Sequence, residues 1–175
     1  AVSDRIAVMK NGTIQQVGNP ISIYTRPYNV FVATFIGHSN LFYANIKIEG
    51  NDTYLLFRCG YKLKMDNLLD VKDGDEVIVG IRPEEFFLDP NNGEGIKAKI
   101  LSKTFLGKYT NYFLHFNDNE IVPDQPSIEY SQDSSYTDKI YEKDEVITLK
   151  PNANKINVFT PDMEKSLIKG VKKYE

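Results

Sequence analysis

The sequence predicts a mainly β protein, with strands arranged as a sandwich or a small barrel after an initial hairpin and two short helices. Short runs of alternating polar and apolar residues recur along most of the chain, separated by turn signals about every 8–12 residues. The eleven tyrosines and ten phenylalanines support this prediction, because aromatic residues fit the half-buried surface of a sheet. Apolar and charged residues make up 41% and 26% of the 175 residues, a balance that indicates an ordinary globular protein.

The first forty residues predict the hairpin and the helices. Asn11-Gly12 lies between two apolar runs, and this pair favours a type I′ turn because both residues accept a positive φ. Asn19-Pro20 is typical of a helix start, and we expect that helix to end before Pro27. A second helix is predicted from the helical spacing of Val30, Phe31, Thr34 and Phe35, with Gly37 as its C-cap.

After residue 40 the apolar period changes from helical to alternating, which predicts eight to ten short strands. The stretch Asp89–Gly95 is the most loop-like part of the chain, and 117–144 is polar and irregular. We also predict an edge strand at 127–130 and a terminal helix at 162–172, capped by Thr160 or Asp162.

Composition argues against several classes of protein. The net charge of −3 does not fit the basic surface that nucleic-acid binding needs. No apolar run reaches the ~18 residues of a membrane span, and no leader segment is evident. The single cysteine, Cys59, forms no internal disulfide, which fits a reducing compartment. We therefore expect a soluble, cytoplasmic chain.

Motifs for catalysis, cofactors and metals are weak. His38 and His115 lie far apart and lack partners at metal-ligand spacing, and Cys59 has no evident base nearby. The run from Gly93 to Ala98 matches a lenient dinucleotide fingerprint, but a loop precedes it and a predicted strand follows it. We expect no catalytic residues, no cofactor and no metal in this chain.

A dense series of short motifs occupies the first part of the chain. It consists of Ser-Asp-Arg-Ile, Gly-x-Ile-x-Gln-x-Gly, Pro-x-x-Ile-Tyr-x-x-Pro, Phe-Val-Ala and Phe-Ile-Gly. This series resembles the end of the nucleotide-binding domain in ATP-binding cassette importers of the maltose, polyamine and iron type. The motif positions to which the resemblance assigns a structural role are Asp4, Arg5, Gly12, Gly18, Pro20, Tyr24, Pro27, Phe31, Phe35 and Gly37.

The remainder is similar to the C-terminal regulatory domain of the same ATPases, a TOBE domain of oligonucleotide-binding-like (OB-like) β-barrels. The run Gly80–Glu85, with Ile-Arg-Pro-Glu at its centre, carries this resemblance best. The resemblance implies two parts: residues 1–40 as the end of the nucleotide-binding domain, and residues 41–175 as the regulatory domain.

The resemblance also implies a function in regulation and dimerisation. Its expected partners are a second copy of the chain, the permease subunits of a transporter at the inner face of the membrane, and a regulatory protein or solute. These residues contain no phosphate loop, signature motif or switch histidine, so ATP and Mg²⁺ are expected to bind only in a longer parent protein. Arg82, Pro83 and Glu84 are the candidate interface residues; the competing interpretation is a strand-ending turn with a local ion pair.

Two other functions remain open from the sequence. A small-ligand sensor would use backbone N–H groups near Gly93, Gly95 and Gly107 to bind an oxyanion or another solute. An oligonucleotide-binding barrel would stack bases on its aromatic residues, although the charge balance disfavours it. The run 38–42 replaces the Met-Asn-Phe-like run of sugar-importer relatives, which favours iron, polyamine or phosphonate as the transported solute.

Overall fold

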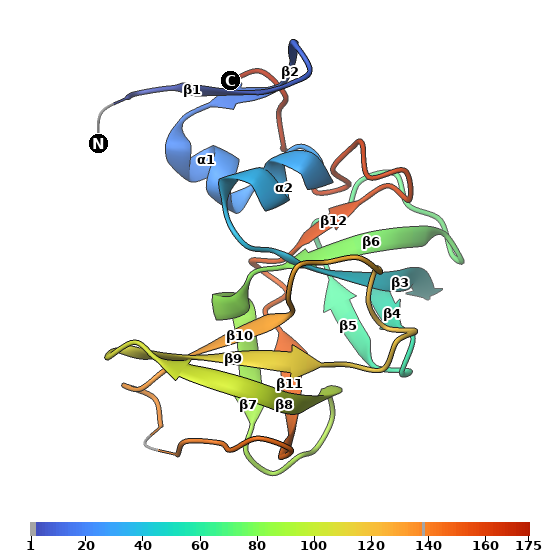
Figure 1. Ribbon diagram of the computed structural model, residues 1–175. Coiled ribbons are helices and arrows are strands. Elements are labelled where there is room, and N and C mark those ends of the chain that lie inside the picture. The colour runs from blue at the N-terminus through green and yellow to red at the C-terminus, as the bar shows by residue number, and fades with distance from the viewer. Residues whose placement is uncertain (1–2, 138) are drawn as a thin grey trace.

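The computed structural model describes residues 3–137 and 139–175. Figure 1 shows three layers: a helical layer with the N-terminal hairpin, a first sheet beneath it, and a second sheet farthest from the helices. The hairpin β1–β2 and the last residues of the chain lie at the same end of the molecule (Figure 1), where Val17 forms a bridge with Tyr174. The C-terminal residues are therefore part of the layer that carries the importer-like motifs.

The helical layer forms as its local signals predict. Asn11 and Gly12 have φ of 49° and 78° between the paired first strands. The side chain of Asn19 accepts the N–H of Ser22 at 2.9 Å, which caps the first helix. The predicted hairpin and both helices are thus confirmed. Their bounds are β1 Ile6–Lys10, β2 Thr13–Gly18, α1 Pro20–Thr25 and α2 Val30–Ile36.

Ten further strands form two antiparallel five-stranded sheets, ordered β12-β6-β3-β4-β5 and β10-β9-β8-β11-β7. The first sheet contains β3 Asn40–Glu49, β4 Asp52–Phe57, β5 Lys62–Met65, β6 Glu76–Ile81 and β12 Asn157–Phe159. The second contains β7 Phe86–Asp89, β8 Ile96–Phe105, β9 Tyr109–His115, β10 Glu129–Asp133 and β11 Val146–Pro151, and the 3-10 helix η1 Pro83–Glu85 joins the two sheets.

The main core lies between the sheets and centres on Phe42 of β3. This side chain is fully buried, and its ring meets those of Phe57, Phe86 and Phe116 edge-on at 6.2, 6.2 and 5.0 Å. Phe57 belongs to the first sheet, Phe86 to the second, and Phe116 follows β9. One aromatic cluster therefore fastens the two sheets together.

The predicted mainly β class is confirmed, and the predicted edge strand is confirmed as β10. The closed β-barrel that the resemblance implied is wrong for the described residues. A barrel closes only when the two end strands of a sheet pair with each other, and neither β12 with β5 nor β10 with β7 does so. No helix in this part of the chain is both long enough and apolar enough to traverse a bilayer.

The predicted terminal helix at 162–172 is wrong, because the described chain there is extended and turned. The hydroxyl of Thr160 donates to Asp162 at 2.5 Å and accepts the N–H of Lys165 at 3.2 Å. The expected capping side chains thus close a tight turn instead of starting a helix. Beyond the turn, Leu167 donates its N–H to Val158 and Ile168 forms a bridge with Leu68, so tertiary pairing takes the place of the helix.

Replacing Phe42 with Ala is expected to lower the free energy of unfolding by about 3–5 kcal/mol, because the change leaves a cavity between the sheets. Urea denaturation monitored by circular dichroism measures this loss. The control is Phe105→Ala, whose side chain is 70% exposed, and which should change stability by less than about 0.5 kcal/mol. Equal losses in the two variants would contradict the central role of Phe42.

Candidate functional site

The candidate site is the junction between the helical layer and the sheets, and Arg82 lies at its centre. Arg82 follows β6 and precedes Pro83, the first residue of η1. A residue before proline favours extended backbone, and Arg82 has φ −71° and ψ 151°. This conformation directs the chain into η1, and the Arg82 side chain is 94% buried against the helices.

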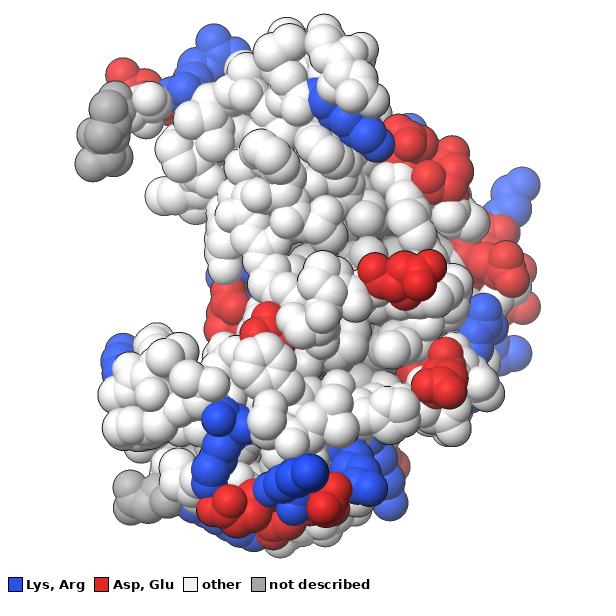
Figure 2. Space-filling model, in the orientation of Figure 1, with Lys and Arg blue, Asp and Glu red and all other residues white. Residues whose placement is uncertain are grey.

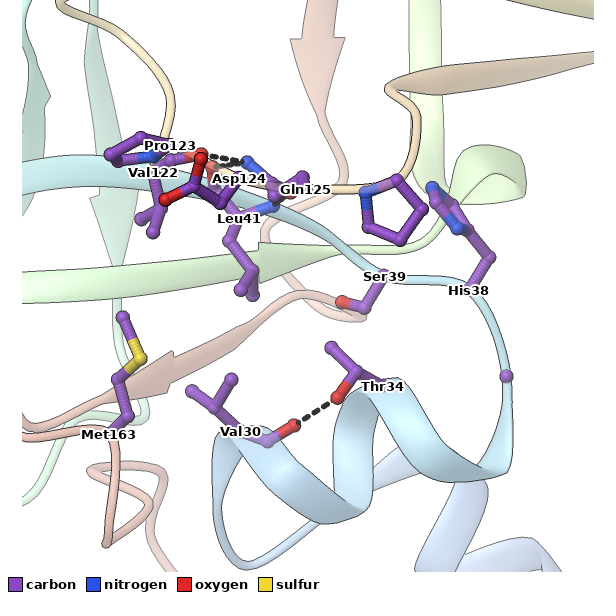
Figure 3. Close-up of a pocket in the computed structure, with 12 residues that line it drawn as sticks. Val30, Thr34, His38, Ser39, Leu41, Val122, Pro123, Asp124, Gln125 and Met163 are labelled. Carbon is purple, nitrogen blue, oxygen red and sulfur yellow. Dashed lines mark hydrogen bonds between the residues drawn. The ribbon is translucent and has the colours of Figure 1, made fainter.

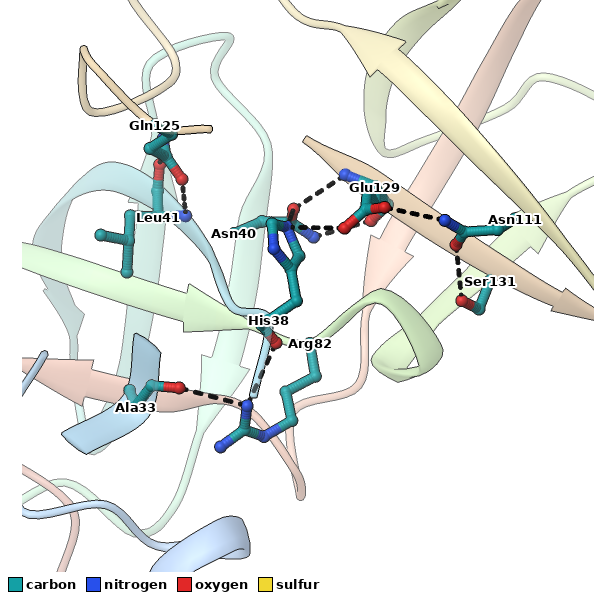
Figure 4. Close-up of polar contacts among 9 residues, drawn as sticks. All are labelled: Ala33, His38, Asn40, Leu41, Arg82, Asn111, Gln125, Glu129 and Ser131. Atoms are coloured by element: carbon teal, nitrogen blue, oxygen red, sulfur yellow. Dashed lines mark hydrogen bonds and ion pairs between the residues drawn. The ribbon is translucent and has the colours of Figure 1, made fainter. Parts of the chain in front are cut away.

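The guanidinium of Arg82 donates only to backbone carbonyls of the helical layer and the segment after it. Nε and Nη2 donate to the carbonyl of Tyr24 at 3.2 and 2.7 Å. Nη1 donates to the carbonyls of Ala33 and His38 at 3.3 and 3.1 Å (Figure 4). The last carbonyls of a helix lack partners within it and carry partial negative charge. One cation therefore satisfies the ends of both helices.

The close approach of Arg82 requires a small residue at position 37. A Cβ on Gly37 would lie 3.2 Å from Arg82 Nη1 and 3.2 Å from a ring carbon of Tyr24. The Gly37 backbone is extended, with φ of −176°, so its conformation alone does not require glycine. The glycine at the end of the Phe-Ile-Gly motif is therefore explained by packing, since a larger side chain would collide with Arg82 and Tyr24.

Tyr24 covers the other side of the guanidinium. Its ring centroid lies 3.9 Å from the guanidinium carbon of Arg82, and its hydroxyl donates to the carboxylate of Glu84. Burial is the larger cause and this hydrogen bond the next, and together they raise the pKa of Tyr24 to about 12. Burial also lowers the pKa of Arg82, while the nearby Tyr24 and Glu84 favour its charged form.

A second polar network continues from the junction into the second sheet (Figure 4). His38 Nε2 lies 3.2 Å from the carboxylate of Glu129. The buried amide of Asn40 accepts the N–H of Glu129 at 2.9 Å and donates to its carbonyl at 2.7 Å. The carboxylate of Glu129 accepts from Asn111 at 2.8 Å, and Asn111 accepts from Ser131 at 2.8 Å. The end of the helical layer is thereby connected to β10.

A cavity of about 530 Å³ lies beside these networks (Figure 3). Val30 and Thr34 of α2 form one wall, and Leu41 and Met163 form part of the opposite wall. The loop on its rim is fixed by Gln125, whose amide accepts the N–H of Leu41 at 2.7 Å and donates to its carbonyl at 2.9 Å. The helical layer therefore rests on the sheet over an incompletely filled space.

The structure places the predicted interface residues Arg82, Pro83 and Glu84 together at this junction. Within the described residues no ion pair joins Arg82 to Glu84, so the expected local pair is not formed. Pro83 is buried, and Glu84 is exposed and bonded to Tyr24. Contact of these residues with a partner stays a prediction.

Several motif positions contact the C-terminal residue, a contact that no pattern in the sequence predicted. Arg5 donates to the carbonyl of Glu175, and a Cβ on Gly18 would lie 3.0 Å from its carboxylate. Val17 between them forms a bridge with Tyr174. The other motif positions are Gly12 in the hairpin turn, Pro20 at the start of α1, the exposed Asp4, the buried Pro27, and Phe31 stacked on the exposed Phe35 at 5.4 Å.

The three candidate anion-binding glycines do not converge. Gly93 and Gly95 precede β8, whereas Gly107 follows it, and ten residues of strand span about 30 Å. The N–H of Gly93 already donates to the carboxylate of Asp89 at 3.2 Å, so an anion there would meet a like charge.

The remaining reactive side chains form no common site. Within residues 3–137 and 139–175 no group of three His, Cys, Asp or Glu side chains is placed to hold a metal ion. His115 is exposed on β9, and Cys59 is exposed in the turn after β4. A buried carboxyl, Glu120, lies beside this thiol, and burial raises the pKa of Cys59.

Basic and acidic side chains lie intermixed on the face in Figure 2, with no continuous basic surface among the described residues drawn there.

Comparison with known proteins identifies the region to which this junction belongs. Residues 79–159 match the model of the TOBE domain. The Fe(3+) ions import ATP-binding protein FbpC of Fusobacterium nucleatum subsp. nucleatum is 42% identical over 172 residues, which cover 98% of this chain. The chain corresponds to the C-terminal TOBE-domain region of the ABC importer ATP-binding proteins of the FbpC and PotA type. It aligns with the C-terminal part of these importer proteins and spans 43% of the length of the Fusobacterium protein.

A second importer relative supports the same assignment. The spermidine/putrescine import ATP-binding protein PotA of Thermotoga maritima is 33% identical over 136 residues, covering 70% of this chain and 35% of that protein. The cytoplasmic molybdate-binding protein ModG, solved with molybdate bound, shares the fold with a TM-score of 0.51. At 12% identity over 70% of this chain and 96% of that chain, the ModG likeness concerns the fold alone. The resemblance to importer ATPases predicted from the sequence is confirmed.

Replacing Arg82 with Met is expected to lower the free energy of unfolding by about 3 kcal/mol, because the carbonyls of Tyr24, Ala33 and His38 lose a buried donor. Urea denaturation measures the change. Arg58→Met is the matched control, since Arg58 is exposed and its replacement should cost less than about 1 kcal/mol. A loss of similar size in both variants would show that the Arg82 bonds contribute little.

The stability of this importer domain is expected to fall as the pH rises from about 10 to about 12. The folded protein keeps the Tyr24 proton up to a pKa of about 12, against 10.0 for a free tyrosine. The folded state therefore binds more protons than the unfolded state in this interval, and the free energy of unfolding declines with pH. Tyr24→Phe removes this contribution, so its stability should decline less steeply between pH 10 and 12. Identical slopes in the two proteins would refute the shift.

Proposed function

We propose that this chain is the regulatory and dimerisation region of an importer's ATP-binding subunit, and that its Arg82 junction transmits movement between the nucleotide-binding domain and the sheets. The single observation that carries the proposal is the buried guanidinium that bonds to the carbonyls of Tyr24, Ala33 and His38. The helical layer resembles the end of a nucleotide-binding domain, so we expect it to move when that domain moves. Because Arg82 joins the helical layer to the sheets, such a displacement must either move the sheets or break these bonds.

The path from the helices into the sheets supports transmission. Arg82 and Tyr24 connect α1 to η1, and His38 with Asn40 connects the segment after α2 to Glu129 of β10. Buried polar groups in such networks are costly to separate. A tilt of the helical layer therefore favours a matching shift of η1 and β10 over rupture of the junction.

The wider assignments belong to the same proposal. ATP and Mg²⁺ bind in the part of the longer protein outside these residues, and these residues bind neither on their own. Residues 41–175 form an OB-like regulatory domain through which two copies associate, while the subunit works with permease partners at the inner face of the membrane. Identity of 42% to an Fe(3+) importer protein favours ferric iron as the solute, with polyamines next.

The test uses the full-length subunit with its permease and solute receptor in proteoliposomes. Arg82→Met is expected to lower solute uptake per ATP hydrolysed by about fivefold or more, the scale of a coupling free energy of 1–3 kcal/mol. Uptake and ATP hydrolysis are measured in the same vesicles below the unfolding temperature of the variant. Arg58→Met serves as the control, because Arg58 is exposed and follows β4 of the first sheet. This variant should keep the wild-type ratio. An unchanged ratio in Arg82→Met would overturn the proposal.

A further inference from the structure

A cavity of about 590 Å³ lies between β7 and β10. These are the two outermost strands of the second sheet, whose order is β10-β9-β8-β11-β7 (Figure 1). Phe86 and Leu88 of β7 and Ser131 of β10 line the same cavity. The sheet therefore curls until its two unpaired edges border one space.

The outer edge of β10 presents a free peptide group. Leu114 of β9 donates its N–H to the carbonyl of Ile128, and alternate residues of an antiparallel strand face opposite sides. Glu129 consequently faces outward, where the Asn40 amide satisfies both its N–H and its carbonyl. Ser131 is the next outward residue, and no hydrogen bond reaches its N–H or carbonyl from the described part of the chain.

The outer edge of β7 is free in the same way. Asn152 donates its N–H to the carbonyl of Glu85, and the strand register places Phe87 opposite Lys150. Phe87 therefore bonds to β11, and Leu88 faces outward. Its N–H and carbonyl also lack partners among the described residues. A sheet edge of this kind is a template for another strand.

A buried side chain in the cavity wall lacks a hydrogen-bond acceptor. Gln132 is 97% buried, and its Oε1 accepts the hydroxyl of Tyr112 at 2.9 Å. That hydroxyl also accepts the N–H of Tyr141 at 3.0 Å, which leaves its own hydrogen to donate to Gln132 Oε1. The Nε2 of Gln132 is left without a partner, although buried donors are normally paired. A carbonyl oxygen in the cavity would satisfy it.

The rest of the lining defines what kind of strand would fit. Aromatic rings dominate the walls, among them the buried Tyr130 and the exposed Phe87 and Tyr136. The charged lining residues are the carboxylates Glu84 and Asp133, and the described lining contains no Lys or Arg. An apolar side chain beside a basic one would complement this surface.

We propose that this cavity is a docking groove for an extended peptide segment of a partner protein, one that carries an apolar residue and a Lys or Arg. The segment adds a strand between β7 and β10. Its backbone pairs with Ser131 and Leu88, and one of its carbonyls accepts from Gln132. Pairing of the backbone supplies affinity, and the aromatic walls with the two carboxylates supply selectivity.

The test selects binders from a phage-displayed library of random 12-residue peptides on the intact chain. We expect enriched sequences to alternate apolar and polar residues and to contain Lys or Arg. A synthetic peptide of the enriched sequence is then measured by fluorescence anisotropy. Ser131→Pro removes the outward N–H without removing a backbone bond of the sheet, and should weaken binding about tenfold, the worth of one lost hydrogen bond. Pro and Ala both remove the bond from the Ser131 hydroxyl to Asn111, so the comparison between the two variants isolates the N–H. Ser131→Ala keeps this N–H and should bind within about twofold of wild type.

Hydrogen exchange on the wild-type chain gives a readout that does not depend on the folding of a variant. Saturating peptide should slow exchange of the Ser131 and Leu88 amides at least about tenfold, while amides of β5, an edge strand of the other sheet, keep their rates. Three outcomes would overturn the proposal: no enriched sequence, no protection at Ser131 and Leu88, or protection there caused by a second copy of the chain in the absence of peptide.

Discussion

A single buried cation bonded to the ends of two helices is the interaction on which the arrangement of this molecule depends. The Arg82 guanidinium has no carboxylate ion-pair partner among the described residues and donates instead to three carbonyls. Water is largely excluded there, so neither the cation nor the carbonyls would be satisfied if the layers separated. The surrounding features serve this interaction: Gly37 leaves room for it, the Tyr24 ring covers it, and Pro83 directs the chain so that the side chain reaches the helices.

The parts of the fold that follow from short-range rules could be predicted from the sequence. The type I′ turn at Asn11-Gly12, the helix start at Asn19 and the edge position of β10 are each encoded within a few residues. The terminal helix was predicted wrongly because the same polar residues that cap helices also close turns, and long-range pairing of Leu167 and Ile168 decided between the two. The sequence near residues 160–172 contains no information about this long-range pairing.

The candidate site was only partly visible in the sequence. Arg82 could be singled out from its motif, but its partners come from segments more than forty residues away. Asn40 and Glu129 gave no signal, because an amide that pairs with a remote backbone looks like any polar residue at the start of a strand. Glu84 belongs to both the junction and the cavity between β7 and β10. Its carboxylate accepts the Tyr24 hydroxyl, and the residue also lines that cavity. A group that draws this carboxylate into the cavity leaves Tyr24 without its acceptor.

The pairing of β2 with residues 173–175 has a consequence for refolding. Val17 of β2 accepts the N–H of Glu175 and donates to the carbonyl of Lys173, so a contact between segments more than 150 positions apart completes the edge of the hairpin. Contacts between such distant segments carry a large loop-closure cost, and they form late unless the intervening chain is already folded. Both sheets lie between these segments in the sequence, so the edge of β2 gains its partner only after the sheets have formed.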